Sequence, residues 1–258
     1  MLSRAEQKRI RALRQRKNRD RERRFLAEGV RIVEDLLAAR IEVDLIVASS
    51  SLEDTERGRR LAAKLAGIAP VRRVGDAELA RLAATETPQG VLVVGVQPRS
   101  DWPSLAAESD GRPWLVLDAV QDPGNFGTLV RSADAFGATG VVTLPGTVDP
   151  WNPKSVRAAA GSTFRVPVWT AEPAAAFERL RRLGIRILAA DAAGRAIGGE
   201  DLERPVALVV GNEGAGLNDA VRAAADGVVG VPMPGRAESL NVAVAAGILL
   251  YLLTRKAR

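Results

Sequence analysis

Short apolar runs alternate with helix-like segments along the second half of the chain, and this pattern constrains the fold more than any other feature. Each run has the length of a buried strand, and turn-forming residues separate it from the next segment. Strands that alternate with helices predict a mostly parallel sheet, and therefore an α/β fold. The expected strands cover residues 114–118, 140–144, 166–168, 185–190, 206–210 and 227–231. The expected helices cover residues 128–136, 152–160, 174–183, 218–224 and 239–255.

The first 98 residues repeat this alternation on a smaller scale. Strands are expected over residues 43–48, 71–74 and 91–96, and helices over 30–39, 53–65 and 76–83. Residues 99–113 are rich in Pro, Ser, Asp and Gly, which indicates a linker. The sequence therefore predicts two domains, residues 1–98 and 114–258, on either side of this linker.

The absence of cysteine and histidine from all 258 residues excludes several kinds of chemistry. There can be no disulfide, no thiolate nucleophile and no Ser-His-Asp triad. No carboxylate cluster has the spacing of a metal-binding loop, so no metal is expected. The N-terminus lacks the apolar core of a secretory signal, and the apolar stretch 240–253 is too short to span a bilayer. A cytoplasmic protein with no membrane partner is the simplest interpretation.

Positive charge is concentrated at the N-terminus. Residues 1–31 contain twelve Lys and Arg against four Asp and Glu, so their net charge of +8 exceeds the +6 of the whole chain. We expect residues 3–24 to form a polar, Arg-rich helix or a partly disordered arm. A basic segment of this kind favours a polyanionic partner such as nucleic acid. The alternative is a solvated helical tail without a partner.

Three polar or Gly-rich loops follow expected strands, where open α/β sheets bind ligands. The first is the turn 122–127, followed by Arg131; the second is 211–217, whose glycines let a ligand approach the backbone. The third is the Pro-rich loop 231–235, followed by Ser239 and Asn241 at the start of the last helix. We interpret Ser239 as the N-cap of that helix. Each loop alone is also consistent with an ordinary structural turn.

Taken in this order, the loops resemble the motifs of the SpoU/TrmH-type RNA 2′-O-ribose methyltransferases of the SPOUT class. The first motif covers residues 117–127 with Arg131, the second 211–214, and the third 231–233 with 239–242. Segment 149–161 is also similar to the family, and residues 25–29 and 87–90 resemble the substrate-binding domain that many members carry. The resemblance therefore covers nearly the whole chain.

The resemblance implies a C-terminal SPOUT domain with a parallel sheet and a deep trefoil knot that forms an S-adenosylmethionine pocket. A small α/β substrate-binding domain, similar to an RNA-binding ribosomal protein, would precede it. The implied protein is a homodimer with its active site near the subunit interface. The implied activity is S-adenosylmethionine-dependent methylation of a ribose 2′-hydroxyl in RNA, with 23S or other ribosomal RNA as the favoured substrate.

The resemblance also assigns individual residues to the site. The catalytic region would contain Asn125, Arg131, Glu213, Ser239 and Asn241. The cofactor pocket would be lined by Gly211, Asn212, Gly214, Val231, Met233 and Leu240. Lys154, Arg157 and Arg165 are candidates for contacts with RNA phosphates. The family role of Arg131 as a general base conflicts with the permanent positive charge of a guanidinium, so we expect Arg131 to stabilise the developing alkoxide or to bind a phosphate.

Three other functions remain open at this point. The first two alternatives are methylation of transfer RNA, and RNA binding on the same fold without catalysis, as in a ribosome-assembly protein. A nucleotide-dependent oxidoreductase is disfavoured because no G-x-G-x-x-G follows an expected strand.

Overall fold

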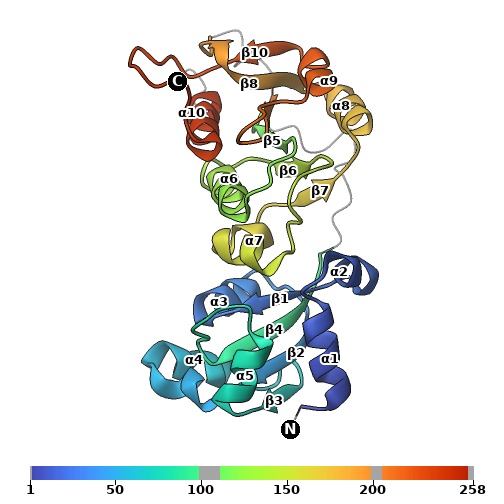
Figure 1. Cartoon of the computed structure of the whole chain (residues 1–258), viewed down its shortest axis with the longest axis vertical. Coiled ribbons are helices and arrows are strands. Elements are labelled where there is room, and N and C mark those ends of the chain that lie inside the picture. The colour runs from blue at the N-terminus through green and yellow to red at the C-terminus, as the bar shows by residue number, and fades with distance from the viewer. Residues whose placement is uncertain (1, 99–110, 199–204, 255–258) are drawn as a thin grey trace. The chain divides into compact units, whose positions relative to one another are not determined.

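The computed structural model describes residues 2–98, 111–198 and 205–254, which fall into two compact units (Figure 1). The N-terminal unit contains Met1–Arg99 together with Asp149–Phe164, and the C-terminal unit contains Ser100–Val148 and Arg165–Arg258. Segment 149–164, which the sequence analysis assigned to the second domain, thus groups with the first unit. Most of the expected linker 99–113 lies outside the described residues.

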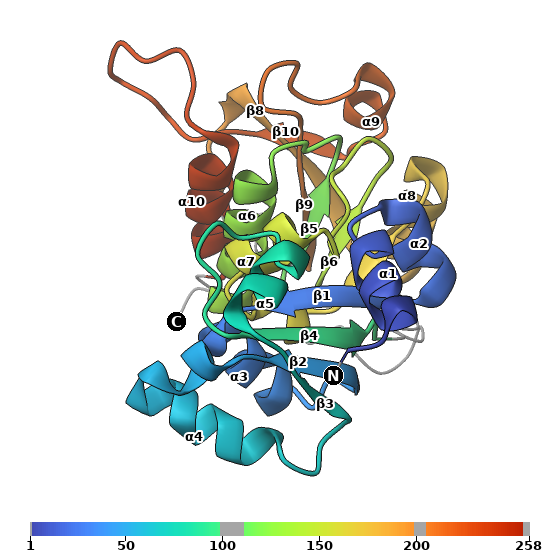
Figure 2. The same cartoon turned by 60° about the horizontal axis from the view of Figure 1, so that its bottom comes forward.

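A four-stranded sheet forms the centre of the N-terminal unit, in the order β1-β4-β2-β3 (Figure 2). Strand β4 is antiparallel to both β1 and β2, and β3 is parallel to β2. The strands cover Arg24–Glu28 (β1), Val43–Ala48 (β2), Val71–Arg73 (β3) and Val91–Val96 (β4). The three strands expected here are confirmed, whereas β1 was not expected.

Helices cover both faces of this sheet. On one face, α3 (Val30–Ala38) and α4 (Glu56–Leu65) pack with segment 149–164. On the other face, α1 (Arg4–Ala12) and α5 (Asp76–Leu82) bury Ile10, Leu79 and Leu82 against the strands. A short 3₁₀ turn, η1 (Ser50–Asp54), precedes α4, which is capped by Thr55. Strand β4 therefore buries both of its faces, which accounts for its nearly continuous apolar sequence.

The basic N-terminal segment is helical rather than disordered. Ser3 and Glu6 form a capping box: the Ser3 hydroxyl accepts from the Glu6 amide at 3.1 Å, and Glu6 accepts from the Ser3 amide at 2.7 Å. A second helix, α2, covers Arg16–Glu22. Because Ile10 and Leu13 are fully buried, the segment belongs to the core of the unit.

A buried ion pair joins this basic segment to residue 149. The Arg19 side chain is 2% exposed, and its Nε donates to Asp149 Oδ2 at 2.7 Å, while Nη2 donates to the same oxygen. Its Nη1 donates to the carbonyls of Leu13 and Arg14 at 2.8 and 2.7 Å. Arg19 is thus a buried arginine of the core, with its charge paired to Asp149.

Segment 149–164 completes the core behind β1. It contains α7 (Pro153–Ala158) and the turn η2 (Ser162–Phe164). The rings of Trp151 and Phe164 lie 4.7 and 5.7 Å from that of Phe25, measured between centroids. Val156 belongs to the same buried cluster, so this segment supplies core side chains that residues 1–98 lack.

The C-terminal unit has a six-stranded, fully parallel sheet in the order β10-β8-β9-β5-β6-β7 (Figure 1). This confirms the expected parallel sheet. The strands cover Trp114–Leu117 (β5), Gly140–Thr143 (β6), Val168–Thr170 (β7), Arg186–Arg195 (β8), Val206–Val210 (β9) and Gly227–Val229 (β10). The strand expected over 166–168 begins two residues later, and β8 continues well beyond the expected end at residue 190.

The helices around this sheet in the described part of the unit are α6 (Pro123–Ala135), α8 (Pro173–Arg182), α9 (Asp219–Ala223) and α10 (Val242–Thr254). Helices α6 and α10 lie side by side (Figure 1). A Cβ added at Gly247 of α10 would lie 3.5 Å from the Ser132 hydroxyl of α6. Within the described residues, no helix has the length and apolar character needed to cross a membrane.

The start of α6 differs from the sequence expectation. The helix begins at Pro123 rather than at residue 128, because the Asp122 side chain accepts from the Asn125 amide at 2.8 Å and proline occupies the first turn. The Asp-Pro-Gly sequence is therefore an N-terminal cap of a helix, and Asn125 and Arg131 lie on one helix.

The carboxyl ends of β5 and β9 adjoin although the two strands are far apart in sequence. Leu117 pairs with Val210, so the loops that follow the two strands leave the sheet together. Adjacent loops at the carboxyl edge of a parallel sheet are the usual place for a ligand site in such folds.

Candidate active site

Asn212 closes the loop that follows β9 and ties it to the loop that follows β5. Its Oδ1 accepts from the amides of Gly214 and Ala215, both at 2.9 Å, and its Nδ2 donates to the Ala119 carbonyl at 2.9 Å. Nearby, the buried Asp118 carboxylate accepts from the Asn218 amide at 2.7 Å. The loop is held at both ends, so Glu213, at its tip, has a defined position.

The Glu213 carboxylate joins the two loops. It accepts from Asn125 Nδ2 at 3.0 Å, from the Asp122 amide at 3.1 Å and from the Gln121 amide at 3.3 Å. Partial burial raises the pKa of Glu213, but these N–H donors favour the charged form and outweigh burial, so the net pKa is lowered. A carboxylate with a lowered pKa is a weak base, and its hydrogen bonds indicate a role in orienting Asn125.

Asn125 also contacts the last helix. Asn241 Nδ2 donates to Asn125 Oδ1 at 3.0 Å, while Asn241 Oδ1 accepts from the amides of Ala243 and Val244 at 2.9 and 3.3 Å. Asn241 is therefore the cap of α10, and the interpretation of Ser239 as that cap is wrong because the helix begins at Val242. The connected side chains run from Glu213 through Asn125 to Asn241.

Arg131 lies outside this chain of hydrogen bonds. It is exposed on α6, and within the described part of the molecule its guanidinium has no hydrogen bond or ion pair. It lies six positions after Asn125, which places it about 9 Å along the helix axis and about 120° around it. The guanidinium is therefore free to bind an anionic group.

A cavity of about 350 Å³ lies between these loops and α10. All six residues expected to bind the cofactor line it, namely Gly211, Asn212, Gly214, Val231, Met233 and Leu240. Two of the five expected catalytic residues, Glu213 and Ser239, also line it, while Asn125, Arg131 and Asn241 do not. The cavity therefore unites the second and third loops, and Glu213 connects it to the first.

The sequence analysis missed part of the cavity wall. The missed residues are Ala190, Asp191 and Ala192 in the middle of β8, Gly230, and the helical residues Val242, Ala245 and Leu249, among others. The signal that points to 190–192 is their position after an expected strand of the same parallel sheet. Gly211 is also required structurally, since a Cβ there would lie 2.3 Å from the Gly216 carbonyl carbon.

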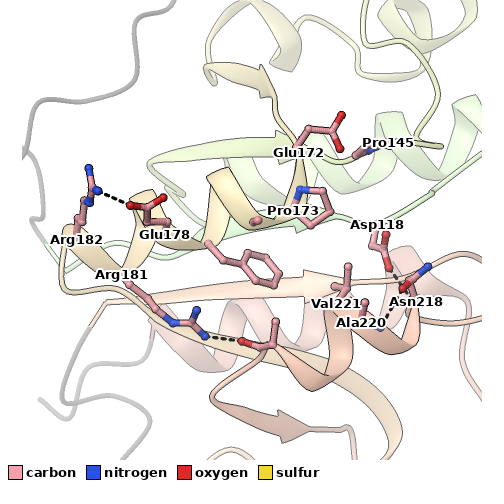
Figure 3. A pocket seen from close by; sticks show the side chains of 13 residues that line it. Asp118, Pro145, Glu172, Pro173, Glu178, Arg181, Arg182, Asn218, Ala220 and Val221 are labelled. Atoms are coloured by element: carbon pink, nitrogen blue, oxygen red, sulfur yellow. Dashed lines mark hydrogen bonds and ion pairs between the residues drawn. The ribbon is translucent and has the colours of Figure 1, made fainter.

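A second cavity, of about 870 Å³, lies between α8 and α9 (Figure 3). None of the expected site residues lines it. Its arginines are already paired: Arg181 donates to Asp226 and to the Ala224 carbonyl, and Arg182 pairs with Glu178. Although this cavity is larger, the first one contains all the expected cofactor-binding residues and therefore defines the candidate site.

The expected RNA contacts differ in their surroundings. In the N-terminal unit, Lys154 and Arg157 are exposed three residues apart on α7, a spacing that places them on one helix face. In the C-terminal unit, Arg165 donates to Asp134 through both Nε and Nη2, at 2.9 and 2.7 Å. Asp134 compensates the charge of Arg165, so Lys154 and Arg157 are better placed to attract phosphate.

Comparison with known proteins decides the family. The model of the SpoU rRNA Methylase family matches residues 113–251, and that of the MRM3-like substrate binding domain matches residues 5–93. This chain belongs to the SpoU rRNA methylase family. The matched range contains the cavity and every residue of the hydrogen-bonded chain. The resemblance inferred from the three motifs is confirmed.

Relatives of this SpoU family member are similar over nearly its full length. A 23S rRNA (guanosine(2553)-2′-O)-methyltransferase, RlmP, of Bacillus subtilis is 36% identical over 243 residues, covering 92% of this chain and 91% of the relative. The structure of the SpoU methyltransferase AviRb from Streptomyces viridochromogenes in complex with AdoMet has a TM-score of 0.87 at 30% identity, covering 98% of each chain. An rRNA methyltransferase structure from Sinorhizobium meliloti has a TM-score of 0.83 at 33% identity, covering 99% of this chain and 96% of that one.

Proposed function

We propose that this protein transfers a methyl group from S-adenosylmethionine to a ribose 2′-hydroxyl of ribosomal RNA. The observation that carries the proposal is the cavity that all six expected cofactor-binding residues line, joined through Glu213 to Asn125 and Asn241. The full-length similarity to a 23S rRNA 2′-O-methyltransferase supports ribosomal RNA over transfer RNA.

The cavity suits a cofactor with a flat ring and a positive charge. Val231, Met233 and Leu240 offer an apolar wall to an adenine ring, and the turn at Gly211–Gly216 exposes backbone groups. S-adenosylmethionine supplies an electrophilic methyl group on a sulfonium when it is bound. The protein holds this group and the ribose in line, since alignment of two bound reactants removes much of the barrier.

The polar side chains beside the cavity position the ribose. Glu213 fixes the amide of Asn125, and Asn241 fixes it from the other side, so Asn125 presents a defined orientation. Ser239 lies at the cavity wall with its hydroxyl available to the sugar. Arg131 stabilises the negative charge that grows on the 2′-oxygen, and the proton leaves to water or to a substrate phosphate.

Methyl transfer to deproteinised ribosomal RNA tests this proposal. With S-adenosylmethionine labelled in its methyl group, label should enter 23S RNA at a ribose, which makes the adjacent phosphodiester resistant to alkali. Transfer RNA is the matched alternative substrate. Label confined to transfer RNA, or bound cofactor without transfer to either RNA, would contradict the proposal.

We also propose that a face of α1 contacts RNA phosphates. Arg4, Lys8 and Arg11 are exposed at four- and three-residue spacing, and none has a side-chain partner among the described residues. By contrast, Arg14 and Arg19 donate to protein carbonyls. The basic segment thus divides into arginines that hold the fold and a free basic face.

Replacing Arg4, Lys8 and Arg11 with glutamine is expected to make the fall of log affinity with log salt less steep. The magnitude of the slope should decrease by about 2 to 3, since each phosphate contact contributes about 0.7 to 0.9. Filter binding of ribosomal RNA from 50 to 300 mM salt measures the slope. The control replaces Arg57, Arg60 and Arg73, which are paired with Glu34, Glu56 and Glu53. An equal fall in the control would assign the effect to overall charge instead of to α1.

We propose that the protein is a homodimer joined through α10. Four large apolar residues form an exposed stripe along this helix and its preceding turn: Leu240, Val244, Ile248 and Tyr251 are 37%, 50%, 37% and 50% exposed. A contiguous apolar stripe of this kind is typical of a protein interface. The stripe includes Leu240 of the cavity wall, which is consistent with an active site near the interface.

Placing glutamate at both Val244 and Ile248 is expected to convert the dimer to a monomer in sedimentation velocity experiments, because two buried charges without partners oppose association. Ala175→Glu, on the exposed face of α8, is the matched control and should leave the dimer intact. A wild-type protein that sediments as a monomer at tens of micromolar would refute the proposal.

Family membership suggests two further proposals, which concern a knot and the cellular location. We propose that the C-terminal unit contains the deep trefoil knot, and the contacts of loop 211–218 and of Asn241 with residues 118–125 support it. We propose that the protein acts in the cytoplasm, because its relatives act on ribosomal RNA.

A further inference from the structure

Only two of the described residues that line the cofactor cavity are ionisable, and both are acidic: Asp191 and Glu213. Glu213 is occupied by donors from Asn125 and the 121–122 backbone. Each Asp191 oxygen accepts only one hydrogen bond among the described groups, so both retain acceptor capacity. The two carboxylates therefore differ, and Asp191 is the one available to a ligand.

The Asp191 carboxylate is held in place by two donors. Its Oδ1 accepts from the Ala193 amide at 2.8 Å, and its Oδ2 accepts from Arg222 Nη1 at 2.6 Å. The Asp191 side chain is 23% exposed. Arg222 belongs to α9 and does not line the cavity. Asp191 lines the cavity and Arg222 does not, so the negative member of the ion pair lies on the cavity side.

The backbone around Asp191 is also tightly packed. A Cβ on Gly230 would lie 2.5 Å from the Asp191 carbonyl oxygen, and a Cβ on Gly194 would lie 2.3 Å from the Val229 carbonyl carbon. Only glycine at these two positions permits the end of β8 to approach β10 so closely. Asp191 therefore has little freedom to move away from the cavity.

From this geometry we infer that Asp191 is a positioning residue that makes the cavity prefer the cationic methyl donor to the neutral product. The inference rests on the proposed function. In the reaction the ribose 2′-oxygen bonds to the methyl carbon, the carbon–sulfur bond breaks, and its electron pair stays on sulfur. The sulfonium charge disappears while the 2′-oxygen proton leaves to water or phosphate. A fixed carboxylate attracts the donor more strongly than the product, S-adenosylhomocysteine, and so favours product release.

Titration calorimetry with three ligands tests this inference. The ligands are S-adenosylmethionine, S-adenosylhomocysteine and sinefungin, whose amine places a positive charge near the sulfonium position. For Asp191→Asn, the ratio of the Kd of S-adenosylhomocysteine to that of S-adenosylmethionine should fall about 3- to 10-fold. Sinefungin should follow S-adenosylmethionine. Asparagine keeps an oxygen that can accept from Ala193, so local structure is preserved.

Arg222→Gln is the matched variant with the opposite expected sign. Removing the Arg222 cation leaves the negative charge of Asp191 uncompensated, so the ratio of the Kd of S-adenosylhomocysteine to that of S-adenosylmethionine should rise. This variant tests the inference even if Asp191→Asn fails to fold. Equal weakening of all three ligands by Asp191→Asn would overturn the inference, because it would indicate a contact with the shared ribose or amino acid. A ratio that is unchanged in both variants would also overturn it. If the wild-type protein binds none of the ligands, the proposed function itself fails.

Discussion

Replacing Arg131 with lysine is expected to lower kcat for methyl transfer at least about 100-fold while leaving the Kd of S-adenosylmethionine unchanged. Lysine keeps the charge but loses the planar pair of donors that can bind an oxyanion and a neighbouring phosphate together. Arg131 does not line the cofactor cavity and has no partner among the described residues, so neither cofactor binding nor stability should change. Single-turnover methyl transfer and calorimetry on the same preparation provide the two measurements.

Arg182→Lys is the matched control for this prediction. Arg182 is an exposed helical arginine of the same unit that pairs with Glu178 away from the candidate site. Its substitution should leave kcat at the wild-type value. Full activity of Arg131→Lys would show that the two-donor geometry is not used, and loss of cofactor binding would move Arg131 into the cofactor site.

Asp149→Asn is expected to reduce the free energy of unfolding of the N-terminal unit by about 3–5 kcal/mol, since it leaves a buried guanidinium without its counter-ion. The Arg19 and Asp149 side chains are only 2% and 7% exposed. Urea unfolding followed by tryptophan fluorescence measures the loss, because Trp151 lies two residues from Asp149 and packs against Phe25.

Two comparisons separate this effect from a general loss of charge. Arg16→Gln breaks an exposed pair with Asp20 and should cost no more than about 1 kcal/mol. Replacing Arg19 with methionine and Asp149 with leucine together should cost less than Asp149→Asn alone, because no buried charge is left without a partner. A double variant that is less stable than the single variant would disprove this explanation.

The sequence predicted those helices and strands whose boundaries depend on neighbouring residues in the chain. Strands β2, β4 and β9 were found because apolar runs end there at turn residues. The starts of α6 and α10 were misplaced because two residue types fit each cap. Asp122 followed by proline fits a turn as well as a helix start, and Ser239 fits a cap as well as Asn241 does.

The site was predicted unevenly for a similar reason. The six cofactor-cavity residues belong to contiguous loops, so a motif finds all of them. Asp191 is a single acidic residue within β8, and its role depends on Arg222 and on the close approach of β8 to β10, which no local pattern encodes. Likewise, the burial of Arg19 depends on Asp149, 130 residues away.

The path of the chain between the two units has a consequence for their evolution. Because Asp149–Phe164 returns to the N-terminal unit, the chain passes between the units three times. Residues 1–98 alone would lack Asp149, Trp151 and Phe164, which partner Arg19 and Phe25. The substrate-binding region therefore cannot be exchanged between relatives as residues 1–98 alone. A chimera of two relatives would have to exchange residues 149–164 along with the N-terminal residues. Recombination within residues 99–113 alone would leave the core of the N-terminal unit without its matching segment.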